Sequence, residues 1–167
     1  MSGFETQAGE LTAKIASLLT ARNWKMVTAE SCTGGWIAKC CTDRAGSSDW
    51  FDRAYVSYSY AAKEQMLGVS HDDLIQHGAV SELIARQMAN AAKQRANVEV
   101  AVAVTGIAGP GSDGSDKPVG FVHFGWCIGD QPVSCGVAVF DGDRRAVRQQ
   151  TVLHALEGIA LRLESGA

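Results

Sequence analysis

Apolar residues recur along this chain at helical spacing in three long segments. The spacing predicts amphipathic helices over residues 8–22, 81–94 and 143–164. The apolar stripe of the last helix runs from Val152 to Leu163. Two shorter helices and a turn are expected over 33–42, 61–67 and 68–73. Helices of both lengths are therefore spread over the whole chain.

Shorter apolar runs lie between these helices. They predict five strands, over 24–30, 54–58, 98–104, 121–128 and 133–140. The run 98–104 is apolar on both alternations apart from Glu99, which is typical of a central strand buried on both faces. The last two runs flank a Gly-Asp-Gln-Pro turn and predict a hairpin. The pattern indicates one α/β domain over 1–167, with three α/β/α layers and a mixed, mostly parallel sheet that includes one antiparallel hairpin.

Composition narrows the function classes. The 167 residues carry a net charge of −3, whereas nucleic-acid-binding domains are usually basic. No apolar run is long enough for a membrane span, and the N-terminus lacks a signal-peptide pattern, so a cytoplasmic protein is expected. Five Cys without a C-x-x-C pair and four His without ligand spacing give no indication of a metal site.

The segment 28–35, TAESCTGG, sets a hydroxyl and a thiol side by side where a predicted strand meets a helix. Backbone N–H groups at such a junction favour developing negative charge. Ser31 is therefore a candidate nucleophile, with an oxyanion site in its own backbone. Two alternatives stand beside it. Ser31 and Thr33 can simply cap the helix, and Cys32 is a rival nucleophile.

A glycine-rich segment, TGIAGPGSDG at 105–114, follows the predicted central strand. Ligands of α/β sheets bind at the carboxyl ends of strands, and glycines let backbone N–H groups approach an anion. The segment indicates either a phosphate contact or a flexible loop. It contains G-x-G-x-x-G but leads into a strand rather than a helix, so it does not predict a dinucleotide site.

A serine nucleophile needs a base, and no His stands in an obviously suitable position. Lys63 follows the second predicted strand. A Lys acts as a general base when burial lowers its pKa; the alternative is a solvated Lys beside Glu64. Arg144 or Arg145, ahead of the last helix, is a candidate phosphate ligand or ordinary surface charge.

Together these segments resemble the CinA C-terminal domain family, whose stand-alone members are nicotinamide-mononucleotide amidohydrolases. The matching pieces cover about residues 8–163; the two most specific are TAESCTGG at 28–35 and TGIAGP at 105–110. The resemblance implies a Ser31 nucleophile and a Lys63 base. Lys63 is expected to take the Ser31 proton directly, through Tyr58 or through a second hydroxyl. Substrate contacts are expected from Cys32, Thr33, Gly34, Gly35, Ser48, Thr105, Gly106, Ala108, Gly109 and Arg145. Ala61 departs from the family, where many relatives carry Asn.

The implied reaction hydrolyses the carboxamide of nicotinamide mononucleotide to nicotinic acid mononucleotide and ammonia, with no metal and no cofactor. The expected partners are a small nucleotide substrate and further copies of the chain in a homo-oligomer, without nucleic acid or membrane. Two other functions stay open: an amidohydrolase acting on another small amide, and a non-catalytic nucleotide-binding module tied to competence or DNA damage.

Overall fold

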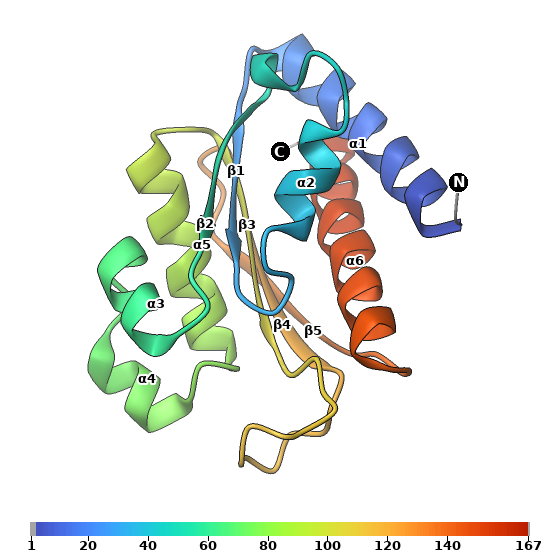
Figure 1. The fold of residues 1–167 in the computed structure, drawn as a ribbon. Helices are drawn as coiled ribbons and strands as arrows, with labels where there is room; N and C mark the ends of the chain where they lie inside the picture. The colour runs from blue at the N-terminus through green and yellow to red at the C-terminus, as the bar shows by residue number, and fades with distance from the viewer. Residues whose placement is uncertain (1–2, 167) are drawn as a thin grey trace.

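The computed structural model describes residues 3–166, and its centre is one five-stranded sheet (Figure 1). The strand order is β2-β1-β3-β4-β5. The strands are β1 (Met26–Glu30), β2 (Phe51–Val56), β3 (Val100–Gly106), β4 (Phe121–Ile128) and β5 (Ser134–Val139). β1 pairs in parallel with β2 and β3, whereas β4 runs antiparallel to both β3 and β5. Four strands therefore point the same way, as the sequence predicts.

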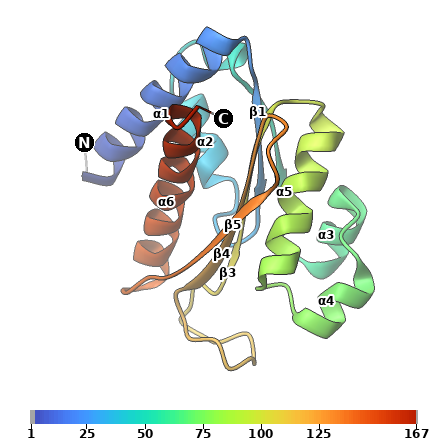
Figure 2. The ribbon, with the colours of Figure 1, turned by 180° about the vertical axis from the view of Figure 1, so that it is seen from behind.

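Helices cover both faces of the sheet (Figures 1 and 2). One face carries α1 (Gly3–Arg22), α2 (Trp36–Thr42) and α6 (Arg144–Glu164). The other carries α3 (Tyr60–Leu67), α4 (His71–His77) and α5 (Glu82–Ala96). The predicted α/β/α arrangement is confirmed.

The side chains of β3 divide the core into two clusters. Val100, Val102 and Val104 pack with the α1 and α6 side, whereas Ala101 and Ala103 pack with the α5 side. All five are fully buried, which confirms the prediction of a central strand buried on both faces. Burial of alternate side chains on opposite faces fixes the register of the strand, because a shift of one residue would exchange the two sets.

Several element boundaries differ from the sequence-based expectation. Residues 71–77 form α4 where a turn is expected, because Ser70 caps the segment by accepting a hydrogen bond from the N–H of Asp73. β2 starts at Phe51 rather than residue 54 and ends before Tyr58, since its ladder with β1 stops at the pair Glu30–Val56. A short 3₁₀ turn, η1 (Ser47–Asp49), leads into β2.

The carboxyl ends of β1, β2 and β3 meet at one edge of the sheet. The N–H of Ser31 donates to the carbonyl of Val104 at 3.2 Å, and the N–H of Ser57 donates to the carbonyl of Glu30 at 2.9 Å. The residues that follow the three strands are therefore brought together, which is where α/β proteins place their ligands.

Candidate active site

A serine and a lysine meet at this edge. Lys63 Nζ lies 2.9 Å from Ser31 Oγ, 2.8 Å from the Ser57 carbonyl and 3.0 Å from the Tyr58 carbonyl. Lys63 is fully buried, and Ser31 is 7% exposed. The structure thus brings together two of the residues that the sequence places in the catalytic site, although 32 positions separate them.

The start of α3 explains the position of Lys63. Ser59 caps this helix by accepting a hydrogen bond from the N–H of Ala62, and Lys63 lies in its first turn. Helical side chains lean towards the N-terminus of their helix. The amine of Lys63 is therefore directed back onto the carbonyls that precede the helix and onto Ser31 beyond them.

Burial lowers the pKa of Lys63 from its ordinary value of 10.5 to about 8; the neighbouring Cys32 thiol acts in the opposite direction. A neutral amine has two hydrogens and one lone pair. The two carbonyls can accept both hydrogens, which leaves the lone pair for the Ser31 hydroxyl. This arrangement suits an amine that takes a proton from a serine.

Cys32 is poorly suited to the same task. Burial raises the pKa of its thiol from 9.0 to about 12. A thiol with such a pKa stays protonated at neutral pH, and the thiolate is the nucleophilic form of cysteine. The alternative that Cys32 is the nucleophile therefore finds no support in its surroundings.

The turn after Ser31 differs from the cap expected there. The N-cap of α2 is Gly35, whose φ of 94° is left-handed, and no side-chain hydrogen bond caps the helix at this position. Instead the Glu30 carboxylate accepts the N–H groups of Ile37 at 2.9 Å and Ala38 at 3.0 Å. Capping by Ser31 or Thr33 is therefore wrong, because a carboxylate from the preceding strand already occupies the end of the helix.

Glu30 is fully buried and accepts two more hydrogen bonds, from the hydroxyls of Thr28 at 3.0 Å and Thr33 at 2.7 Å. A buried carboxylate needs such partners to offset the loss of hydration. Glu30 belongs to the TAESCTGG motif, but the motif alone does not predict its role. A charged residue in a strand predicted to be buried is the signal that identifies it.

Arg148 is a second residue that the sequence analysis missed. Its Nε donates to the Cys32 carbonyl at 3.0 Å and its Nη2 to the Thr33 carbonyl at 2.9 Å. Its guanidinium carbon lies 5.1 Å from the centre of the Trp36 ring. It lies one helical turn after Arg144, but nothing in its sequence neighbourhood distinguishes it from ordinary surface charge.

The glycine-rich segment lies beside the serine and lysine, but some of its polar groups are already engaged. The Thr105 hydroxyl donates to the Ala79 carbonyl at 2.8 Å. Arg144 donates to the Gly109 carbonyl at 2.7 Å and lies 3.4 Å from the Tyr58 hydroxyl. Tyr58 is 62% exposed and touches Lys63 through its carbonyl, so its role as a proton relay stays a prediction.

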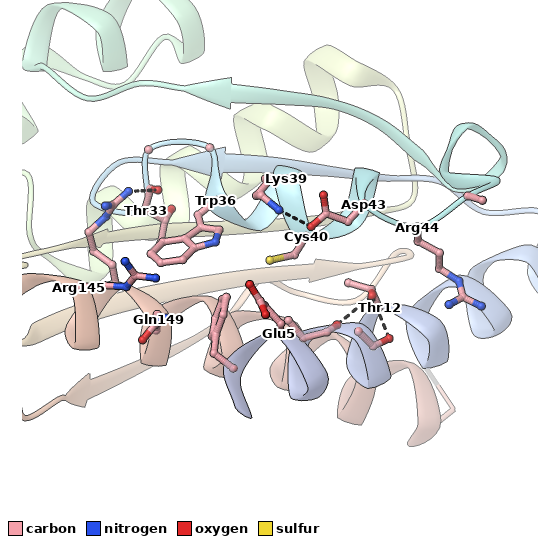
Figure 3. A pocket seen from close by; sticks show the side chains of 17 residues that line it. Glu5, Thr12, Thr33, Trp36, Lys39, Cys40, Asp43, Arg44, Arg145 and Gln149 are labelled. Atoms are coloured by element: carbon pink, nitrogen blue, oxygen red, sulfur yellow. Dashed lines mark hydrogen bonds and ion pairs between the residues drawn. The ribbon is translucent and has the colours of Figure 1, made fainter. Parts of the chain in front are cut away.

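A cavity of about 970 Å³ lies between α1, α2 and α6 (Figure 3). Of the residues expected to bind substrate, it is lined by Thr33, Gly34, Gly35 and Arg145. Figure 3 shows Arg145 at one end of the cavity and Arg44 at the other. Ser31 and Lys63 do not line it, since their contact lies on the α3 side of the turn.

Ser48 lies apart from the other candidates within one copy of the chain. It belongs to η1, and its carbonyl accepts a hydrogen bond from Lys25 Nζ at 3.2 Å. Lys25 precedes β1, whereas Ser31 follows it, so Ser48 is at the opposite edge of the sheet. Its contact with substrate stays a prediction.

Among residues 3–166, no group of three His, Cys, Asp or Glu side chains is arranged so that it could hold a metal ion. None of the helices described is both long and apolar enough to cross a membrane.

Comparison with known proteins identifies one family. The CinA C-terminal domain family matches residues 8–163. The nicotinamide-nucleotide amidohydrolase PncC of Enterobacter agglomerans is 48% identical over 153 residues, covering 92% of this chain and 93% of that protein. The protein of the same name from Escherichia coli K12 is 44% identical with the same coverage.

Solved structures show the same fold. The competence/damage inducible protein CihA from Agrobacterium tumefaciens is similar with a TM-score of 0.91 and 42% identity, over 98% of this chain and 99% of that chain. A competence damage-inducible protein from Klebsiella pneumoniae gives a TM-score of 0.92 at 34% identity, over 96% of this chain and 99% of that one. The predicted resemblance is confirmed: the chain belongs to the CinA C-terminal domain family.

Proposed function

We propose that this chain is an amidohydrolase that converts nicotinamide mononucleotide and water into nicotinic acid mononucleotide and ammonia. The observation that carries the proposal is the 2.9 Å contact between the Ser31 hydroxyl and the buried Lys63 amine. The names of relatives at 44–48% identity support both the reaction and the substrate.

In the proposed reaction, the neutral Lys63 amine takes the Ser31 proton while Oγ bonds to the carboxamide carbon. The carbonyl oxygen becomes an oxyanion, which backbone N–H groups of the turn after Ser31 stabilise. When the intermediate collapses, the C–N bond breaks and Lys63 returns the proton to the leaving ammonia. Lys63 then takes a proton from water as the water oxygen bonds to the acyl carbon. The C–Oγ bond breaks, Lys63 returns the proton to Ser31 Oγ, and nicotinic acid mononucleotide leaves.

The rest of the substrate would extend along the same edge of the sheet. We assign the ribose phosphate to the glycine-rich segment 105–111 and to Arg145 of the same chain. Ser48 is at the opposite edge of the sheet, so a contact from it would have to come from a second copy of the chain. Glycine N–H groups and an arginine fork are both suited to phosphate oxygens.

The test is ammonia release from nicotinamide mononucleotide by the purified protein. Ser31→Ala and Lys63→Ala are each expected to lose at least about 1,000-fold in kcat, because each removes a group that acts directly on the reacting bonds. Cys32→Ala is the matched control: it removes the rival thiol but keeps the backbone N–H groups of the turn, so it should keep its activity because the thiol stays protonated at neutral pH. Thermal unfolding checks that all three variants are folded.

The outcomes separate the remaining functions. Full activity in either of the first two variants would remove that residue from the mechanism. Wild-type protein that binds the nucleotide without releasing ammonia would indicate a non-catalytic module. Protein that neither binds nor hydrolyses it would indicate another small amide as substrate.

A further inference from the structure

We propose that Arg148 is a positioning residue that fixes the turn after Ser31, and with it the orientation of the Ser31 hydroxyl and of the backbone N–H groups that stabilise the oxyanion. This inference rests on the proposed function, since it assigns a part of the same reaction. Arg148 is on α6 and reaches the turn from the face of the sheet opposite to α3, which carries Lys63.

The guanidinium holds two successive carbonyls at once. It donates to the carbonyls of Cys32 and Thr33 at 3.0 Å and 2.9 Å, through two different nitrogens. The Trp36 ring, 5.1 Å away on α2, holds the same guanidinium by a cation–π contact. The Arg148 guanidinium, which α6 carries, is thus held in place by Trp36 of α2. It in turn restrains the peptide groups of Cys32 and Thr33.

The geometry of the peptide bond relates the position of each carbonyl held by Arg148 to the direction of the N–H group in the same peptide. In a trans peptide the carbonyl and the following N–H point in opposite directions. With the Cys32 carbonyl on Arg148, the Thr33 N–H is directed away from the guanidinium. The next N–H, of Gly34, is already taken by the Ser31 carbonyl at 3.1 Å. Thr33 itself is fully buried, so the two contacts of Arg148 fix the orientation of the peptide groups that follow Ser31 from inside the protein.

Glu30 restrains the same residue from the inside of the turn. Its carboxylate accepts the Thr33 hydroxyl at 2.7 Å and also holds the first turn of α2. Thr33 is therefore held by its side chain on Glu30 and by its backbone on Arg148. A donor fixed before the reaction needs no reorganisation when the oxyanion forms, which is the condition under which such donors are most effective.

The experiment compares Arg148→Ala and Arg148→Lys with the matched control Arg22→Ala. Arg22 has the same chemistry far from Ser31: it donates to the carbonyls of Leu18 and Leu163, and it lies 5.8 Å from the Trp24 ring. Arg148→Ala is expected to lower kcat about 100-fold, because small displacements of catalytic groups cost about this much. KM should change less than about threefold, since the donor acts on the transition state.

Two further readouts separate positioning from charge and from folding. Arg148→Lys keeps the charge but not the fork, so it should recover less than a tenth of the lost kcat. Guanidinium ion at non-denaturing concentration should partly restore Arg148→Ala and leave Arg22→Ala unchanged. Rescue by the free ion also shows that the variant is folded.

Three results would overturn the inference: wild-type kcat in Arg148→Ala, full recovery in Arg148→Lys, or a loss that falls on KM alone. A loss of the same size in Arg22→Ala would equally count against it.

A probe that needs no natural substrate keeps this test separate from the proposed function. A fluorophosphonate forms a bond between phosphorus and Ser31 Oγ and releases fluoride, with the proton going to Lys63, and its phosphoryl oxygen also needs a donor. Labelling of Ser31, followed by mass spectrometry, should be about tenfold slower in Arg148→Ala. Wild-type protein that is labelled but releases no ammonia would reject the proposed substrate alone, and equal labelling of both proteins would reject the role of Arg148.

Discussion

At the scale of single residues, the burial of Lys63 lowers its pKa and so sets the pH range in which it can take the Ser31 proton. Only the neutral amine accepts the Ser31 proton, and its pKa is about 8. At pH 7 roughly one molecule in ten carries the neutral form. The site is therefore expected to work better in mildly alkaline solution.

This expectation is testable as a pH profile. We expect kcat/KM for ammonia release to rise about tenfold per pH unit below pH 8 and to level off above it, because the rate follows the fraction of neutral Lys63. Rates measured from pH 6 to pH 10 would show this rise and the plateau that follows it. A profile that does not change slope near pH 8 would contradict the role of Lys63 as the base.

The same pKa predicts a dependence of stability on pH. Lys63 binds a proton less readily in the folded chain, where its pKa is about 8, than in the unfolded chain, where it is 10.5. Between these values the unfolded state holds more protons, so the free energy of unfolding increases as the pH rises. The free energy of unfolding of wild type should therefore rise by about 3 kcal/mol relative to that of Lys63→Met between pH 7 and pH 10.5. Urea denaturation at several pH values measures it, and a constant difference would contradict the lowered pKa.

Arg145 offers a test of phosphate recognition. Removing one charge-assisted contact typically costs about 1.5–3 kcal/mol, so Arg145→Ala should raise KM for nicotinamide mononucleotide by about tenfold or more. KM for nicotinamide riboside, which lacks the phosphate, should stay the same. An equal change in KM for both compounds would show that Arg145 does not bind the phosphate. Arg144→Ala, in the same helical turn, is the comparison variant.

Single residues were predictable from the sequence where their chemistry is unusual for their place in the chain. Ser31 stands at a strand–helix junction and Lys63 at the start of a helix, so both could be singled out. Their contact could not, because it depends on how β1 and α3 pack. Arg148 could not be recognised at all, since its partners are backbone carbonyls 115 and 116 positions away.

At the scale of elements, α2 depends on a residue outside it. This helix has seven residues, and isolated helices of that length are not stable in water. The Glu30 carboxylate satisfies two of its N–H groups from within the core. The turn that carries Ser31 and the start of α2 are thus tied to one buried side chain.

Glu30→Gln tests this dependence. The amide keeps one acceptor but presents an NH₂ group to a buried donor, so the free energy of unfolding should fall by about 1–3 kcal/mol. Thr42→Ala at the exposed end of α2 is the control, expected within about 0.5 kcal/mol of wild type. Chemical denaturation measures both, and equal stability of Glu30→Gln and wild type would show that the carboxylate is not needed.

Element boundaries show where sequence patterns lose information. α4 has few apolar residues and was predicted as a turn, although Ser70 provides the cap that begins it. The start of β2 depends on hydrogen bonds to β1, which no local pattern encodes. α6, which has a long apolar stripe, was predicted to within one residue at each end, whereas β3 begins and ends two residues later than expected.

At the scale of the whole molecule, glycines set how closely the layers approach. A Cβ at Gly158 of α6 would lie within 2.6 Å of Trp126 Nε1 on β4, whereas a Cβ at Gly9 of α1 would meet nothing within 4 Å. The layer order was predictable from the alternation of helices and strands, but this contact was not, because it joins residues from different layers.

Two alanine substitutions test the packing of the layers. Gly158→Ala should lower the free energy of unfolding by about 1–3 kcal/mol, since it forces α6 away from Trp126. Gly9→Ala should raise it by about 0.5–1 kcal/mol, because alanine favours the helix and the space is open. Urea denaturation of both variants gives the signs, and a stabilised Gly158→Ala would contradict the close approach.

The direction of the strands also has a practical consequence. The candidate site lies at the edge of the sheet where β1, β2 and β3 end. Ser31 and the segment 105–114 are found there, and Lys63 reaches Ser31 from α3. The turn between β4 and β5 is at the other edge, where Ile128 pairs with Val100, and its Asp130 is exposed. β3 spans the distance between the two edges, roughly 20 Å. A fluorophore, an affinity tag or a linkage to a solid support at Asp130 would therefore leave the reacting edge open to solution.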